Sequence, residues 1–535
     1  MSDDNGKDYG ITAETIAAAE KIIGIEFTDD ERQQMLNYTN TRAGWYERLR
    51  EIRLENSVAS ALKFDPRLLE SDYAGVNSQP VIMSDIGEIE RPANLEDVAF
   101  WPLAHLAQLI KTKQVTSVEL TEMYMARLKH FNKWLECVVT FTDDLAMEQA
   151  RRADEEIAAG NYRGPLHGIP WGAKDLLAVP GYKTTWGAMP YKEQTIDMMA
   201  TVVKRLEEAG AVLIAKLTSG ALAYGDIWFG GTTKNPWDIS EGSSGSSAGP
   251  GSATAAGLVG FSIGTETLGS IVSPSTRNGV TGLRPTFGRV SRHGCMALSW
   301  SMDKIGPMCR SVEDCGLVFN AIYGPDGLDD HVIDEPFAWD ANNTLNGLKI
   351  GYLKSAFDEE RENKANDDTV LDVLRGSGVQ LIPIELPEID LQPLLIILLA
   401  EGAAAMDEIT RDNLDDQMQW QEEGAWPNTF RQARLIPAVE YIQANRVRTL
   451  AMQQMSKVMQ EIDVFVIPSF GGSSLLLTNL TGHPSVVLPN GFTEKNTPTS
   501  ISFVGNLYQE DKVLTVAKAY QDATDFHKQY PAMKY

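Results

Sequence analysis

Cysteine and histidine are both scarce in this sequence, with four and seven residues among 535. No two cysteines are spaced as Cys-x-x-Cys, and the separation of Cys309 from Cys315 matches no common zinc motif. Four cysteines in a chain of this length do not make a disulfide framework. We therefore expect free thiols, and we expect a catalytic mechanism that does not depend on a cluster of histidines.

Basic residues are also in short supply, because 47 Lys and Arg stand against 73 Asp and Glu and give a formal net charge of −26. A chain this acidic repels phosphate backbones and anionic lipid headgroups. The charge therefore argues against nucleic acid and against a membrane surface as partners.

Long hydrophobic runs are absent as well. The longest run, Leu394 to Ala400, is far shorter than the roughly 18–20 residues that cross a bilayer. The first ten residues, MSDDNGKDYG, have neither the basic start nor the apolar core of a secretory signal. A cytoplasmic location is the resulting expectation, although a chain whose signal had been removed would look the same.

The composition that remains is typical of a globular enzyme, with 43% hydrophobic and 22% charged residues. Near the start, Thr28 and Glu31 form a capping-box pattern that predicts a helix reaching Leu54. Prolines and glycines interrupt the chain after that point. We predict a helical extension with a connecting arm over residues 1–95 and a catalytic domain over residues 96–535.

Within the second region, helical and strand-like segments alternate. A capping box at Thr116 to Glu119 and an apolar period after it predict one helix, and Met198 to Glu208 predicts another. Short apolar runs at Val212–Ala215, Val464–Ile467 and Ser485–Leu488 predict buried strands. This alternation favours an α/β fold with a largely buried mixed sheet.

A tract rich in glycine and serine runs from Gly230 to Gly294. It continues directly into the small apolar segment Ala255–Ile263, which a flexible linker would not do. No Gly-Lys-Ser/Thr follows, which argues against a phosphate-binding loop. Gly245 to Gly249 fits the G-x-S-x-G nucleophile elbow with Ser247 as nucleophile, but turn residues rather than a strand precede it. That elbow would also need a histidine, for which His483 is the best placed.

Ser270, at the end of Gly264–Ser270, offers a different nucleophile. Successive N–H groups of small residues can hold an oxyanion while the serine attacks a carbonyl. A serine needs a base, and with few histidines a desolvated lysine is the next choice. Lys174 and Lys216 both qualify by sequence: Lys174 has apolar, glycine-rich flanks, whereas Lys216 ends a strand, where lysines are usually solvated and structural.

Together, these segments resemble the amidase signature family, a family of serine hydrolases. The resemblance covers about residues 97–530 and rests on ordered blocks: Gly168–Asp175, Asn235–Trp237, Ser244–Gly249, Gly264–Ile271, Gly282–Ser291, Asp303–Met308 and Asn479–Pro484. It implies the family fold, a large, twisted, mostly mixed or parallel sheet with helices on both faces.

The resemblance also implies a Ser-cisSer-Lys triad, with Ser270 as nucleophile, Ser246 after a cis peptide bond, and Lys174 as base. The N–H groups of Thr267, Leu268, Gly269 and Ser270 would form the oxyanion hole. Ser247 and Asp175 would support the site, and no metal or organic cofactor is implied.

Three positions depart from the family pattern. Glu266 replaces the usual aspartate, Leu268 a glycine, and Val272 an arginine whose lost ion pair Arg277 would replace. None of these changes removes a triad residue, so they bear on substrate preference and loop support.

The expected activity is hydrolysis of a small-molecule amide to an acid and ammonia or an amine through a seryl acyl-enzyme. The alternative is the glutaminase-type subunit of a tRNA-dependent amidotransferase; the acidity and the long amino-terminal extension favour the free-standing enzyme. A third alternative is a non-catalytic scaffold. The oligomeric state stays open, with a homodimer as one option. Leu394–Leu399, Trp420 and Trp426 are either an apolar acyl pocket or ordinary core.

Overall fold

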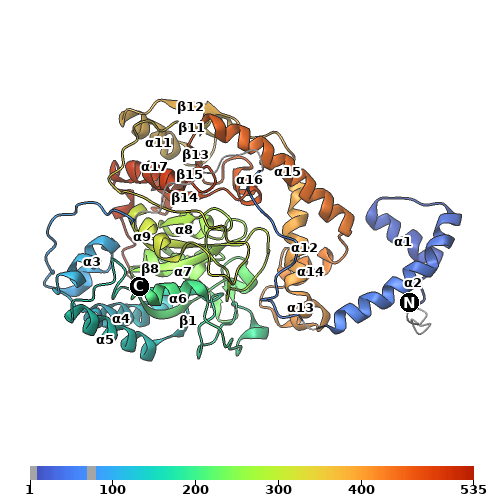
Figure 1. Cartoon of the computed structure of the whole chain (residues 1–535), viewed down its shortest axis with the longest axis horizontal. Helices are drawn as coiled ribbons and strands as arrows, with labels where there is room; N and C mark the ends of the chain where they lie inside the picture. The colour runs from blue at the N-terminus through green and yellow to red at the C-terminus, as the bar shows by residue number, and fades with distance from the viewer. Residues whose placement is uncertain (1–8, 53, 69–79, 535) are drawn as a thin grey trace.

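The computed structural model describes residues 9–52, 54–68 and 80–534 (Figure 1). Its centre is an eleven-stranded sheet in which four neighbouring pairs are parallel and the rest antiparallel. In spatial order the strands are β1 Val138–Phe141, β3 Val212–Leu217, β2 Pro170–Lys174, β8 Phe261–Glu266, β10 Lys304–Cys309, β9 Thr281–Arg284, β14 Ser485–Phe492, β15 Pro498–Gly505, β13 Val464–Pro468, β11 Ile350–Leu353 and β12 Leu381–Ile384.

Helices cover both faces of this sheet, as the family resemblance implies (Figure 1). The helices are α1 Ala13–Ile23, α2 Asp29–Glu51, α3 Leu103–Lys111, α4 Ser117–Leu135, α5 Asp143–Ala158, α6 Thr201–Glu208, α7 Ala248–Ala255, α8 Val272–Asn278, α9 Val312–Ile322, α10 Lys354–Asp358, α11 Lys364–Gly376, α12 Leu395–Ala405, α13 Asp407–Arg411, α14 Trp426–Ala433, α15 Ala438–Glu461, α16 Ser474–Thr481 and α17 Glu510–Asp522. None of the described helices combines the length and the apolar character needed to cross a bilayer.

The strands that carry the site are buried along their whole length. Every residue of β2, β3, β8 and β10 is buried, because helices cover both faces of the sheet. Two large apolar clusters make up most of the core, one around the sheet and one among α12, α14, α15 and α16.

The predicted helix starts at Thr28 and Thr116 are confirmed, since both threonines make the full capping box with the glutamate three residues later. The helix expected to reach Leu54 ends at Glu51, and the one expected from Met198 begins at Thr201. Beyond α2, residues 54–68 form an irregular segment with a turn at Asn56 and Ser57. The division of the chain at residue 95 stays a prediction.

The helices α1 and α2 lie at one end of the molecule, away from the sheet, and the carboxyl end of α2 lies next to α13 (Figure 1). The Cys309 and Cys315 thiols are free, as are those of Cys137 and Cys295, which confirms that the chain has no disulfide framework.

Candidate active site

Lys174 is the last residue of β2, a strand held between β3 and β8, and its side chain is fully buried. Its Nζ lies 2.8 Å from Ser246 Oγ, 2.8 Å from Thr265 Oγ1 and 3.1 Å from Ser247 Oγ. Burial lowers the pKa of Lys174 from the usual 10.5 to about 7, because the nearby charges of Asp303 and Glu266 offset only part of the lost hydration. A large fraction of this amine is therefore uncharged near neutral pH.

Ser246 and Ser247 follow a tight loop that leads into α7. The peptide bond between Gly245 and Ser246 is cis, as the family resemblance predicts. Only glycine fits at position 245, because a Cβ there would lie 1.9 Å from the carbonyl oxygen of Gly225. Ser247 Oγ donates to the Thr265 carbonyl at 3.0 Å and accepts from the Thr265 N–H at 3.1 Å. This double contact joins the serine loop to β8.

Ser270 ends the bend between β8 and α8, and 7% of its surface is exposed. Its carbonyl accepts a hydrogen bond from the Ser247 N–H at 3.2 Å, which brings the two serine loops together. The N–H groups from Thr267 to Ser270 donate to no atom of the described chain. They are available to a ligand oxygen. The Ser246 and Ser270 side chains, both described, make no hydrogen bond with each other.

Glu266, at the end of β8, holds the start of α8 in place. Its carboxylate accepts from the N–H groups of Ile271 and Val272 at 2.8 and 3.0 Å and pairs with Arg284 at 2.9 Å. Burial alone would raise the pKa of Glu266, but the Arg284 charge outweighs it and lowers the pKa to about 2. The expected replacement by Arg277 is wrong, since Arg277 pairs at the surface with Glu241.

Asp175 lies directly after Lys174 but does not contact the lysine amine. Its carboxylate pairs with Lys216 at 2.7 Å and accepts from the Thr185 N–H at 2.9 Å, and both charged side chains are fully buried. Lys216 also donates to the Lys183 carbonyl at 2.9 Å. Lys216 is thus a buried structural cation, and the expectation that it is solvated is wrong because the strand end on which it stands is covered.

The nucleophile elbow is not formed. The strand before Ser247, β7 (Asp238–Gly242), belongs to a separate two-stranded ribbon and ends five residues earlier. The hydroxyl of Ser247 is fully buried against Thr265 and Lys174. His483 bonds to Thr481 at 2.8 Å, and burial lowers its pKa to about 3. None of the described histidines hydrogen-bonds to Ser247.

Two residues of the site were missed from the sequence. Thr265 shares the Lys174 amine with Ser246, and Asp303 accepts a hydrogen bond from Thr267 Oγ1 at 2.6 Å. Asp303 also accepts from the N–H groups of Leu298 and Ser299 at 2.8 and 2.9 Å. Both residues lie inside the blocks that carry the family resemblance, which was the available signal.

Comparison with known proteins agrees with this geometry. The sequence model of the family described as Amidase matches residues 119–477. The chain belongs to this amidase family. It is 30% identical over 480 residues to the A subunit of the glutamyl-tRNA(Gln) amidotransferase of Coxiella burnetii, covering 81% of this chain and 99% of that protein. The protein of the same name from Methylococcus capsulatus is 32% identical over 478 residues, which cover 80% of this chain and 98% of that one.

Solved structures show the same fold. The native peptide amidase from Stenotrophomonas maltophilia is 28% identical, with a TM-score of 0.72 over 82% of this chain and 99% of that one. The match thus spans nearly the whole of that solved chain. The segments before residue 95 lie outside the family match.

The amidase-family chain has a cavity of about 90 Å³ beside the site, with Ala223, Thr265 and Thr267 in its wall. A separate small cavity lies between the loop at Ala221–Tyr224 and Trp420 and Trp426, and the Trp426 indole donates to the Leu222 carbonyl at 2.9 Å. The helix that holds Leu394–Leu399, in contrast, packs into the core beside the sheet. Of the residues weighed for an acyl pocket, Trp426 and most of Leu394–Leu399 belong to the core, and Trp420 lies beside Tyr224 at the small separate cavity.

Proposed function

We propose that this chain hydrolyses a carboxamide through a covalent seryl intermediate, with Ser270 as nucleophile. The observation that carries the proposal is the buried Lys174 amine, 2.8 Å from Ser246 Oγ and with a pKa of about 7. A neutral amine at this position can accept the Ser246 proton while Ser246 accepts that of Ser270. The burial of the lysine makes this relay available without a histidine.

The proposed reaction has two halves. The Ser270 Oγ bonds to the amide carbon, and the carbonyl oxygen takes the negative charge beside the N–H groups of Thr267 to Ser270. The relay then returns the proton to the nitrogen, the C–N bond breaks and ammonia or an amine leaves. Water, deprotonated by the same relay, cleaves the acyl-enzyme to the acid. The missing contact between Ser246 and Ser270 would form on substrate binding, because catalytic hydrogen bonds are often long in free enzymes.

A second candidate is the glutaminase-type subunit of an amidotransferase. The relatives named above carry that name, and they match almost their whole length. This candidate uses the same acylation chemistry on glutamine, but it needs partner proteins that receive the ammonia. In this role the partners of the chain would include other protein subunits, in addition to the small-molecule amide that the sequence analysis expected.

One observation supports the free-standing hydrolase. The match to the amidotransferase subunits covers only about four fifths of this chain. Residues 54–68, which lie outside the family match, line the cavity beside the site, so this chain has a part next to the site that the family model does not include. The neighbour titled a peptide amidase, at 28% identity, adds support for an enzyme that acts on amides directly.

The test is ammonia release by the purified chain alone, from glutamine and from a panel of aliphatic, aryl and peptide carboxamides. Turnover of simple amides by wild type, and none by Ser270→Ala, supports the free-standing hydrolase. Activity confined to glutamine supports the amidotransferase role. Turnover that survives Ser270→Ala overturns the proposed mechanism.

A further inference from the structure

The segment from residue 54 to residue 68, called the arm here, forms the outer wall of the cavity beside the site. Asn56, Ser57 and Ala59 line this cavity from the arm, and Thr265 and Thr267 line it from the body. Its volume of about 90 Å³ is well below the roughly 300–1,000 Å³ of pockets that hold drug-sized ligands. With the arm in this position, only a small group fits in this cavity, which reaches the oxyanion loop at Thr267.

Asn56 fixes one end of the arm. Its side-chain amide donates to the Ala297 carbonyl at 2.8 Å and accepts from the Ala297 N–H at 2.7 Å. The backbone N–H and the carbonyl of Ala297 are thus both hydrogen-bonded to the Asn56 side chain. The next two N–H groups along that loop hold Asp303, which in turn holds Thr267. Asn56 therefore fastens the arm to the loop that supports the proposed oxyanion site.

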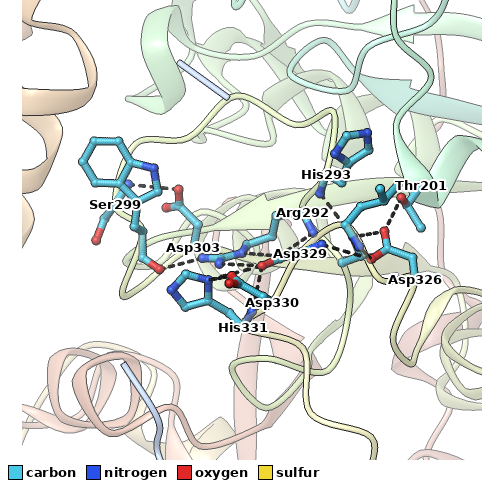
Figure 2. Close-up of polar contacts among 12 residues, drawn as sticks. Thr201, Arg292, His293, Ser299, Asp303, Asp326, Asp329, Asp330 and His331 are labelled. Atoms are coloured by element: carbon cyan, nitrogen blue, oxygen red, sulfur yellow. Dashed lines mark hydrogen bonds and ion pairs between the residues drawn. The ribbon is translucent and has the colours of Figure 1, made fainter. Parts of the chain in front are cut away.

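Lys63 forms the second polar contact of the arm, an ion pair with Asp330. Asp330 also lines the cavity. Asp330 belongs to a cluster with Asp329 and His331 whose ligand atoms lie within 4.8 Å of one another (Figure 2). Arg292 holds Asp329 through two side-chain bonds of 2.9 and 3.2 Å. Cations of the chain thus already neutralise both carboxylates, and the cluster serves as an anchor for the arm rather than as a metal site.

Aromatic and apolar contacts hold the part of the arm that follows Lys63. The Phe64 ring lies 5.1 Å from the Phe287 ring, and the Arg448 guanidinium lies 3.4 Å from the centre of the Phe64 ring. Pro66 is buried and packs against Gly482. The arm therefore contacts the body at Asn56 and from Lys63 to Pro66, whereas Val58 and Leu62 between these contacts are largely exposed.

A much larger cavity, about 840 Å³, lies between residues 60–68 of the arm and the helices α12 and α15. Trp300 lines both this cavity and the small one beside the site, so the two adjoin at its side chain. Residues of the arm therefore line both the small cavity and the large one.

We infer that the arm sets the size of the amide that this chain accepts, and that with the arm docked the preferred substrates carry small groups. The inference rests on the proposed function, because it assumes that Ser270 is the nucleophile. Asn56 acts as a positioning residue, since it holds the arm without touching the reacting atoms.

The test compares how fast an ethyl and a dodecyl fluorophosphonate inactivate the full-length chain. The variants are Asn56→Ala, which removes the hydrogen bonds to Ala297, and Lys63→Ala, which removes the ion pair with Asp330. The matched control is Asn40→Ala, which removes the same group in α2, where the Asn40 amide bonds only within the extension. We expect both arm variants to raise the ratio of the dodecyl rate to the ethyl rate by about tenfold. Tenfold is the low end of the selectivity that a closed hydrophobic pocket shows against a substrate with one extra methylene group.

A general loss of structure would lower both rates and the melting temperature, but it would not raise the ratio. If wild type reacts with the ethyl probe and the ratio is unchanged in both arm variants, the inference about the arm is overturned and the proposed function stands. If wild type reacts with neither probe and hydrolyses no amide, the proposed function fails, and the inference fails with it.

Discussion

Replacing Lys174 by methionine should change how the stability of the protein depends on pH. The folded chain holds this amine with a pKa of about 7, against the ordinary value of 10.5. At about 1.4 kcal/mol for each pKa unit, burial of the charged form costs about 5 kcal/mol relative to the unfolded chain. Methionine has a similar length and no charge, so the variant lacks this cost.

The sign follows from proton binding. Between pH 7 and pH 10.5 the unfolded chain carries a proton on this amine and the folded chain does not. Wild-type stability therefore rises with pH across this window, and below pH 7 the cost is present in full. The lost contacts to Ser246 and Thr265 add a term that does not vary with pH, so the difference between the two proteins isolates the lysine.

The assay is urea unfolding of wild type and Lys174→Met at pH 7, 8 and 9. Relative to the variant, wild type should lose about 2–3 kcal/mol of unfolding free energy between pH 9 and pH 7. Lys129→Met, at an exposed lysine paired with Asp143, is the control and should differ from wild type by little at every pH. A difference between wild type and Lys174→Met that stays flat from pH 7 to pH 9 would refute the reasoning.

Three further predictions concern the same loops. Because the proposed relay needs Lys174 in its neutral form, kcat/KM should rise with pH through an inflection near 7, and a profile with no inflection between pH 6 and pH 9 would contradict this. Ser246→Ala should lower kcat by about 10²- to 10⁴-fold without a matching rise in KM, as measured by steady-state kinetics. Glu266→Gln leaves the buried Arg284 charge unpaired and should lower the unfolding free energy in urea by about 3–5 kcal/mol. Glu241→Gln, which breaks a surface pair, should lower it by less than about 1 kcal/mol, and equal losses would contradict the argument.

Much of the site was predictable because its residues belong to local patterns. Lys174, Ser246 and Ser270 stand in three blocks of the chain that resemble one family, and those blocks meet where β2, the serine loop and β8 converge. The helix starts at Thr28 and Thr116 were predictable for the same reason, since a capping box is complete within four residues.

Contacts between distant segments were not predictable in this way. The sequence analysis expected Arg277 to replace the ion pair lost at Val272, but Arg277 pairs with Glu241, and the buried cation beside the loop is Arg284 on β9, which pairs with Glu266. The burial of Lys216 depends on Asp175 and on the neighbouring loop that covers it. The position of Asn56 against Ala297 joins residues 241 apart and leaves no mark in the local sequence.

The central claim is that Ser270, rather than the neighbouring Ser247, forms the covalent bond. Its most direct test is peptide mapping by mass spectrometry after reaction with a fluorophosphonate, on wild type and on Ser270→Ala. A single adduct on Ser270, absent from the variant, is the predicted result. An adduct on Ser247, or one that persists in Ser270→Ala, would contradict the account.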